Sequence, residues 1–207
     1  MKVLVACEFS GIVREAFKAR GHDAWSCDLL DTEIPGQHIK GDVLEILNDG
    51  WDLMIGHPPC TYISYAGVAH WNNEGRLQKR LDALQFFADL WTAPIEKICI
   101  ENPRSCASPT IAKYTQEIQP FYFGDDFHKP TWLWLKNLPP LIHNEIDTLF
   151  ENKTHSRHPE PAYYQFSGIQ EGRKRYQIDG MKGGKERSKN RSRFFYGIAN
   201  AMANQWG

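Results

Sequence analysis

Short strand-like runs alternate with helical patterns through the first half of the chain, and this alternation limits the possible folds more than any other feature. The predicted strands are 2–6, 23–27, 52–55 and 97–100, and the predicted helices are 10–20 and 74–92. Strands that alternate with helices build mostly parallel sheets with helices on both faces. The sequence therefore predicts an α/β fold, in which ligands bind beyond the carboxyl ends of the strands.

The second half is less regular. Ser108-Pro109 predicts the start of a helix over 109–118, and the runs 121–123 and 131–135 predict two strands joined by a turn. A last helix is expected at about 194–206.

These patterns suggest three parts along the chain. We expect a core of residues 1–137, a small irregular insertion at 138–186, which is rich in proline and glycine, and a C-terminal helix in 187–207 that returns to the core.

Length and cysteine content suggest a reduced, non-membrane protein. The 207 residues suffice for one domain with a sizeable core. No apolar run is long enough to span a membrane, and no signal-like segment is visible, so we expect a cytoplasmic location. The cysteine count of 5 is odd, which favours reduced thiols. The oligomeric state is left open.

Charge is distributed unevenly. Residues 173–193 hold nine Lys or Arg side chains against two acidic ones, a local excess of +7 in a chain whose net charge is −1. A basic segment on an acidic body suggests a nucleic acid or nucleotide partner. The alternative is a solvated loop.

Two residues at predicted strand ends carry reactive groups. Cys60 follows a buried strand and two prolines that impose a rigid turn, so its thiol is a candidate nucleophile. Glu101 ends the next strand, where burial is expected to raise its pKa and allow it to donate a proton. The alternatives are a buried structural cysteine and a carboxylate that caps a turn.

Other strand ends suggest a nucleotide-type site. Asp28 ends the second strand, where an acid takes ribose hydroxyls in nucleotide-binding α/β folds. The turn Phe9-Ser10-Gly11 precedes a helix N-terminus, which favours a negatively charged group. Asp42 is a cap or a ligand-binding residue. We expect no metal, because the His57-x-x-Cys60 spacing has no second matching pair.

Four motifs together resemble the cytosine-5 DNA methyltransferases, in particular the short phage- and prophage-type members. They are Phe9-Ser10-Gly11, Pro58-Pro59-Cys60, Glu101-Asn102-Pro103 and the tail from Arg191 to Ala201. The resemblance covers about residues 1–135 and 186–207. It implies a Rossmann-like methyltransferase fold and, for a phage protein, the host bacterial cytoplasm.

The resemblance also implies a chemistry. Cys60 would add to C6 of cytosine and Glu101 would act at N3, so that C5 accepts a methyl group from S-adenosylmethionine. The cofactor would lie against Phe9, Ser10, Gly11, Asp28, Asp42 and Pro58. The base and its DNA would contact Asn102, Lys129, Arg191 and Arg193, and the base would be flipped out of a duplex.

The sequence departs from that family at two places. Val13 occupies a position where the family usually has a second glycine, and the Gln-x-Arg-x-Arg motif is missing, with Lys129 as the only cation in 124–133. Two alternatives therefore stay open: C5 modification of a free pyrimidine nucleotide, and a non-catalytic binding or decoy protein with a methyltransferase-like fold.

Overall fold

The computed structural model describes residues 1–125, 127–143, 145–147, 153–155, 163–165, 174–176 and 194–207. Its centre is a seven-stranded sheet with the strand order β3-β2-β1-β4-β5-β7-β6. The strands are β1 (Lys2–Ala6), β2 (Asp23–Asp28), β3 (His38–Lys40), β4 (Leu53–Gly56), β5 (Lys97–Pro103), β6 (Gln116–Ile118) and β7 (Thr131–Lys136). The pairs among β1 to β5 are parallel, and β7 runs antiparallel to both β5 and β6. The predicted α/β fold with a mostly parallel sheet is confirmed.

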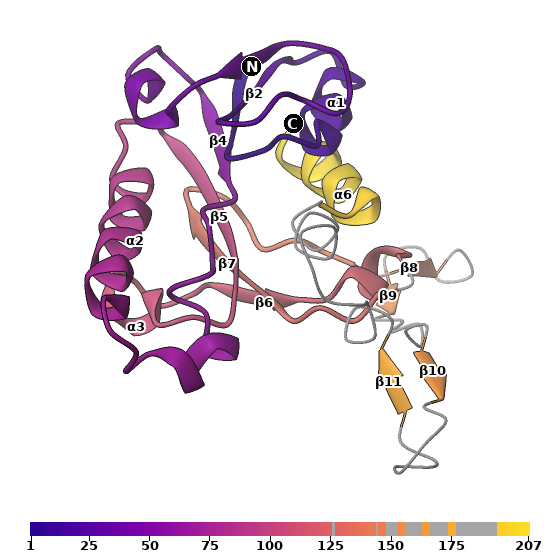
Figure 1. Ribbon diagram of the computed structural model, residues 1–207. Helices are drawn as coiled ribbons and strands as arrows, with labels where there is room; N and C mark the ends of the chain where they lie inside the picture. Colours follow the sequence, from indigo (N-terminus) through magenta and orange to yellow (C-terminus); the bar gives the residue numbers. More distant parts are fainter. Residues whose placement is uncertain (126, 144, 148–152, 156–162, 166–173, 177–193) are drawn as a thin grey trace.

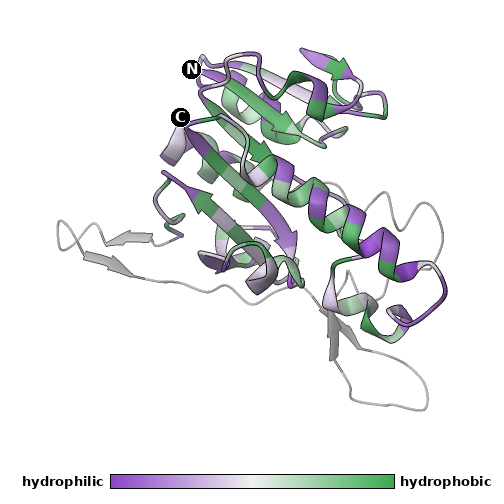
Figure 2. Ribbon diagram, turned by 90° about the vertical axis from the view of Figure 1, so that its left-hand side faces the viewer, coloured by the Kyte–Doolittle hydropathy of each residue, from purple (hydrophilic) through white to green (hydrophobic). Residues whose placement is uncertain are grey.

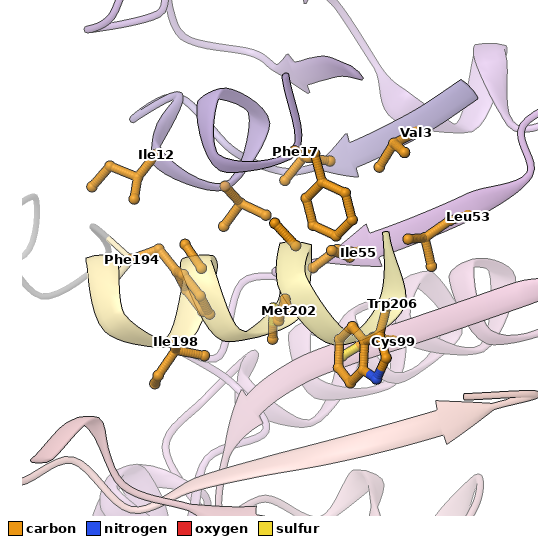
Figure 3. Packing of buried hydrophobic residues seen from close by; sticks show 14 of the residues in the cluster. Val3, Ile12, Phe17, Leu53, Ile55, Cys99, Phe194, Ile198, Met202 and Trp206 are labelled. Carbon is orange, nitrogen blue, oxygen red and sulfur yellow. The ribbon is translucent and has the colours of Figure 1, made fainter. Parts of the chain in front are cut away.

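Helices cover both faces of this sheet (Figure 1). On one face lie α1 (Ile12–Lys18) and α6 (Tyr196–Trp206), which pack on each other and on β1 and β4. Figure 3 shows α6 next to α1, with Phe194, Met202 and Trp206 in the same apolar cluster as Val3 and Ile55.

The other face carries α2 (Arg76–Trp91). Figure 2 shows hydrophobic and hydrophilic bands alternating along this helix. Phe87 and Leu90 are buried against the sheet, whereas Leu77 and Leu81 are exposed. Short 3-10 turns complete this region, namely η1 (Val43–Ile46) and η2 (Tyr65–His70).

The predictions for residues 109–123 were wrong. The helix expected at 109–118 is one short turn, α3 (Ala107–Thr110), and residues 116–118 form strand β6. Pairing with β7 gives the backbone of this segment its hydrogen bonds and buries Ile118, which outweighs the helix-start signal. The strand expected at 121–123 is instead the 3-10 turn η3 (Pro120–Phe123).

Within 138–186 the structure describes four short strands. They are β8 (Glu145–Asp147), β9 (Lys153–His155), β10 (Tyr163–Gln165) and β11 (Lys174–Tyr176), paired antiparallel as β8 with β9 and β10 with β11. Most of the basic segment lies outside the described residues. The three-part division of the chain stays a prediction.

Two absences concern the described residues only. No helix in that part of the chain combines the length and apolar composition needed to cross a membrane. The same residues contain no cluster of three or more histidine, cysteine or acidic side chains suited to a metal ion. All five cysteines are thiols rather than disulfides.

Candidate active site

The order in which the strands are added to the sheet reverses at its centre, between β1 and β4. From β1 the chain builds outward through β2 to β3, and from β4 it builds the other way through β5. In parallel α/β sheets, ligands bind in the crevice outside the carboxyl ends of the strands at this point. The loops after β1, β2, β4 and β5 meet at this edge, and they carry most of the predicted site residues.

The loop after β1 is organised by Glu8. Its buried carboxylate accepts hydrogen bonds from the backbone N–H groups of Val13, at 2.7 Å, and Arg14, at 3.3 Å, at the start of α1. The Ser10 hydroxyl donates to it at 3.1 Å. Burial raises the pKa of Glu8, against the opposing effects of nearby His57 and these hydrogen bonds. The helix N-terminus expected to favour an external anion therefore already holds an internal carboxylate.

The three residues predicted to approach a cofactor here are all buried. Gly11 has φ +78°, and a Cβ there would come within 2.7 Å of the Arg14 guanidinium, so glycine is required at this turn. The carbonyl of Phe9 accepts from the N–H of Glu33. The side chain of Val13, at the family's glycine position, is fully buried in the apolar cluster of α1, α6 and the sheet.

Two predicted acidic residues lie near each other around Cys7. Burial, followed by the charges of Asp28, Cys27 and Asp42, raises the pKa of the Cys7 thiol, which requires both carboxylates to lie nearby. Asp28 accepts from the N–H of Leu30 at 2.9 Å and is half-buried. Asp42 is exposed and caps η1. The edge of the sheet at β1 to β3 is thus acidic.

A second group of charged side chains surrounds Glu101 at the end of β5. Oε2 of Glu101 lies 3.3 Å from Nδ1 of His57, and Oε1 lies 3.9 Å from Nζ of Lys129. The side chains of His57 and Glu101 are only 10% and 8% exposed. Phe194, just before α6, packs its ring on His57 with 4.6 Å between centroids.

Burial of Glu101 is as expected, but the expected direction of its pKa is wrong. Burial alone raises the pKa, yet the charge of Lys129 and the hydrogen bond and charge of His57 outweigh it, so the pKa of Glu101 is lowered. The carboxyl is therefore ionised in the resting protein at neutral pH. The sequence shows a carboxylate at a strand end but not the cations that fold against it.

Cys60 and Glu101 are linked through their neighbours. The side-chain amide of Asn102 donates to the carbonyl of Pro58 at 2.9 Å. This contact joins the end of β5 to the Pro58-Pro59-Cys60 turn. Cys60 is half-buried, and its carbonyl accepts from the N–H groups of Ile63 and Ser64, so the chain forms a turn directly after Cys60.

Two residues of the site were not predicted from the sequence. His57 was considered only as a metal ligand, and Glu8 was not among the candidates. Both follow directly from strand ends, so the rule that identified Asp28 and Glu101 applied to them as well. Arg191 and Arg193 lie outside the described residues.

Neither a protein-family model nor a curated protein matches the chain. Among solved structures, the chain is similar to one provisionally described as a DNA modification methyltransferase encoded within a prophage of E. coli. The sequences are 14% identical and the TM-score is 0.43. The match covers 64% of this chain and 45% of that one, so this chain spans less than half the length of that protein.

Proposed function

We propose that the chain is a DNA cytosine-5 methyltransferase of Rossmann-like fold that uses S-adenosylmethionine, with Cys60 as nucleophile and Glu101 acting at N3 of the base. The observation that carries this proposal is the contact between Asn102 and Pro58, which joins the Cys60 turn to the buried carboxylate of Glu101. Cytosine C5 chemistry requires a thiol and a carboxyl group at one base.

In the proposed reaction the Cys60 thiolate forms a bond to C6, and the electrons of the C5–C6 double bond move towards N3 and O2. Glu101 passes a proton to N3, which leaves C5 enamine-like. Once C5 has accepted the methyl group that S-adenosylmethionine would supply, loss of the C5 proton re-forms the double bond and releases Cys60. Lys129, close to Glu101, would place positive charge near the base.

The acidic edge at β1 to β3 suits the cofactor. Carboxylates accept hydrogen bonds from ribose hydroxyls. Asp28 ends β2, the neighbour of β1, and Asp42 follows β3 at the edge of the sheet, with both carboxylates near Cys7. Phe9, Ser10, Gly11 and Pro58 adjoin this edge in sequence. When bound there, S-adenosylmethionine would supply the electrophilic methyl group.

DNA as substrate is supported by the surface beside the Cys60 turn. Arg76 and Lys79 lie over the ring of Tyr62, at 5.0 and 5.6 Å, and Arg80 lies over Trp71 at 4.5 Å. A hollow of about 280 Å³ opens here, lined by Pro59, Tyr62, Lys79, Asp82, Ala83 and Phe86. Cations that contact phosphates, combined with aromatic rings that stack on bases, are typical of nucleic-acid surfaces.

Transfer of a labelled methyl group tests this proposal. The protein is incubated with labelled S-adenosylmethionine and duplex DNA, single-stranded DNA, RNA or dCMP, and the products are digested to nucleosides. We expect label in 5-methylcytosine from DNA, none with Cys60→Ser, and normal transfer with Cys106→Ser, a second half-buried cysteine. Label from dCMP alone would indicate the nucleotide enzyme. No label with any substrate, from folded protein, would favour the non-catalytic alternative.

A further inference from the structure

His57 lies between two buried carboxylates that come from different strands. It follows β4, whereas Glu8 follows β1 and Glu101 ends β5. Nδ1 of His57 is within hydrogen-bond distance of Glu101, and the charge of His57 affects the pKa of Glu8. Among the described residues, Nε2 of His57 is buried without a hydrogen-bond partner. An imidazole whose Nδ1 lies against a buried carboxylate is placed to exchange a proton with it.

The proposed reaction leaves one requirement unmet. Glu101 is ionised in the resting protein, because its pKa is lowered, so it has no proton of its own to give to N3. Addition of the Cys60 thiolate to C6 nevertheless places negative charge on N3. The proton must therefore reach Glu101 from another group in contact with it.

Two cations are candidates for that group, and the distances separate them. Nδ1 of His57 lies 3.3 Å from Oε2, within hydrogen-bond range, whereas Nζ of Lys129 lies 3.9 Å from Oε1. Imidazole also changes charge near neutral pH, so it releases and regains a proton during a reaction more readily than an ammonium group does.

We propose that His57 supplies the proton that Glu101 passes to N3 of cytosine, and recovers it when the product forms. This inference rests on the proposed function. As Cys60 adds to C6, the Nδ1 proton of the imidazolium form of His57 moves to the ionised carboxylate of Glu101. The carboxylic acid so formed gives this proton to N3, which leaves His57 neutral and Glu101 ionised again. When the C5 proton is lost and the thiolate leaves, the N3 proton returns through Glu101 to His57.

The charged and apolar neighbours of His57 suit this role. Glu8 and Glu101 place carboxyl groups near His57, and Lys129 places an ammonium group on the far side of Glu101. Phe194 covers the imidazole ring and limits exchange with water. His57 is accordingly a positioning and proton-supplying residue that acts through Glu101.

Replacement of His57 by asparagine tests the role. An asparagine amide keeps an N–H donor near the position of Nδ1 but cannot release a proton. We expect kcat to fall about 100-fold, as for loss of a general acid, with DNA and cofactor affinities retained. Wild-type kcat should decline with rising pH as the proton donor is lost, and H57N should lack this decline. His22→Asn, on a histidine far from the site, is the matched control.

Nitrogen NMR of the histidine side chains tests the shared proton without relying on turnover. In Glu101→Gln the Nδ1 chemical shift of His57 should change, because its carboxylate acceptor becomes a neutral amide. Wild-type kcat in H57N, or an unchanged His57 Nδ1 signal in E101Q, would overturn the inference. If wild-type protein transfers no methyl group while the His57 signal changes as expected, the proposed function fails and the hydrogen-bonded pair stands.

Discussion

The side-chain amide of Asn102 donates a hydrogen bond to the carbonyl of Pro58 across a 2.9 Å contact. Asn102 is almost completely buried, and it follows Glu101 directly in the chain. Pro58 lies two residues before Cys60 and has no N–H of its own to fix its position. One amide group therefore sets the position of the thiol turn relative to the carboxylate.

Asn102→Ala should impair the reaction more than the fold. Loss of the donor leaves the Pro58 carbonyl without this partner and costs about 1–3 kcal/mol of stability. Misplacement of the Cys60 turn should lower kcat by about 100-fold, while DNA affinity is retained. Steady-state kinetics, binding titration and urea unfolding measure these effects. Asn73→Ala, at an exposed position, is the control; equal kinetics in both variants would contradict the role of Asn102.

Glu101→Gln should remove turnover and change stability in a pH-dependent way. The pKa of Glu101 is lowered by folding, so its ionised form contributes stability above the pKa of the unfolded chain. That contribution is lost as pH falls through the lower, folded-state pKa. Thermal unfolding from pH 7 to pH 3 should show E101Q less stable than wild type at neutral pH, with the difference closing in acid. A constant difference across the range would show that Glu101 is not ionised in the folded protein.

Lys129→Met should make Glu101 a weaker acid. Lys129 is the strongest of the influences that lower the pKa of Glu101, so its loss lets burial raise that pKa. The alkaline limb of the kcat profile should then move to higher pH, because the hydrogen-bonded His57 and Glu101 lose a neighbouring positive charge and release their proton less readily. Lys129→Arg keeps the charge and should leave the limb near its wild-type position. A limb that does not move in Lys129→Met would place the controlling cation elsewhere.

Arg14→Met should destabilise the side of the sheet formed by β1 to β3. The fully buried guanidinium of Arg14 bonds to Glu15, Ser26, Thr32 and the carbonyl of Ile34, which ties the loop after β2 to α1. Removing it should cost about 3 kcal/mol or more, since buried polar partners lose their bonds. Urea unfolding gives the loss, and Arg20→Met, on an exposed arginine, should unfold like wild type.

The regular elements of the first half were predictable because their signals are local. The spacing of apolar residues located β1, α1, β4 and α2 to within about two residues, and the breaker His57-Pro58-Pro59 marked the end of β4. The region of 107–123 was not predictable in the same way. Its Ser-Pro and β-rich patterns are weak, and pairing with β7, a contact between distant residues, determined which three residues became strand β6.

The candidate site also has features that the sequence predicts and features that it does not. Reactive side chains at strand ends are visible in the sequence, since a parallel sheet brings its carboxyl ends to one edge; Cys60, Glu101 and Asp28 were selected on that ground. Their electrostatic states are not visible in this way. Whether Glu101 holds a proton depends on Lys129 and His57, which lie 28 and 44 residues away along the chain.

The sequence by itself therefore determined the α/β class and the strand ends that carry reactive groups, because apolar periodicity and chain breakers act over a few residues. Only the tertiary structure decided that His57 lies between Glu8 and Glu101, that Asn102 holds the Cys60 turn, and that the pKa of Glu101 falls rather than rises. Charge–charge energies depend on distances between atoms that are remote in sequence, and those distances exist only once the chain has folded.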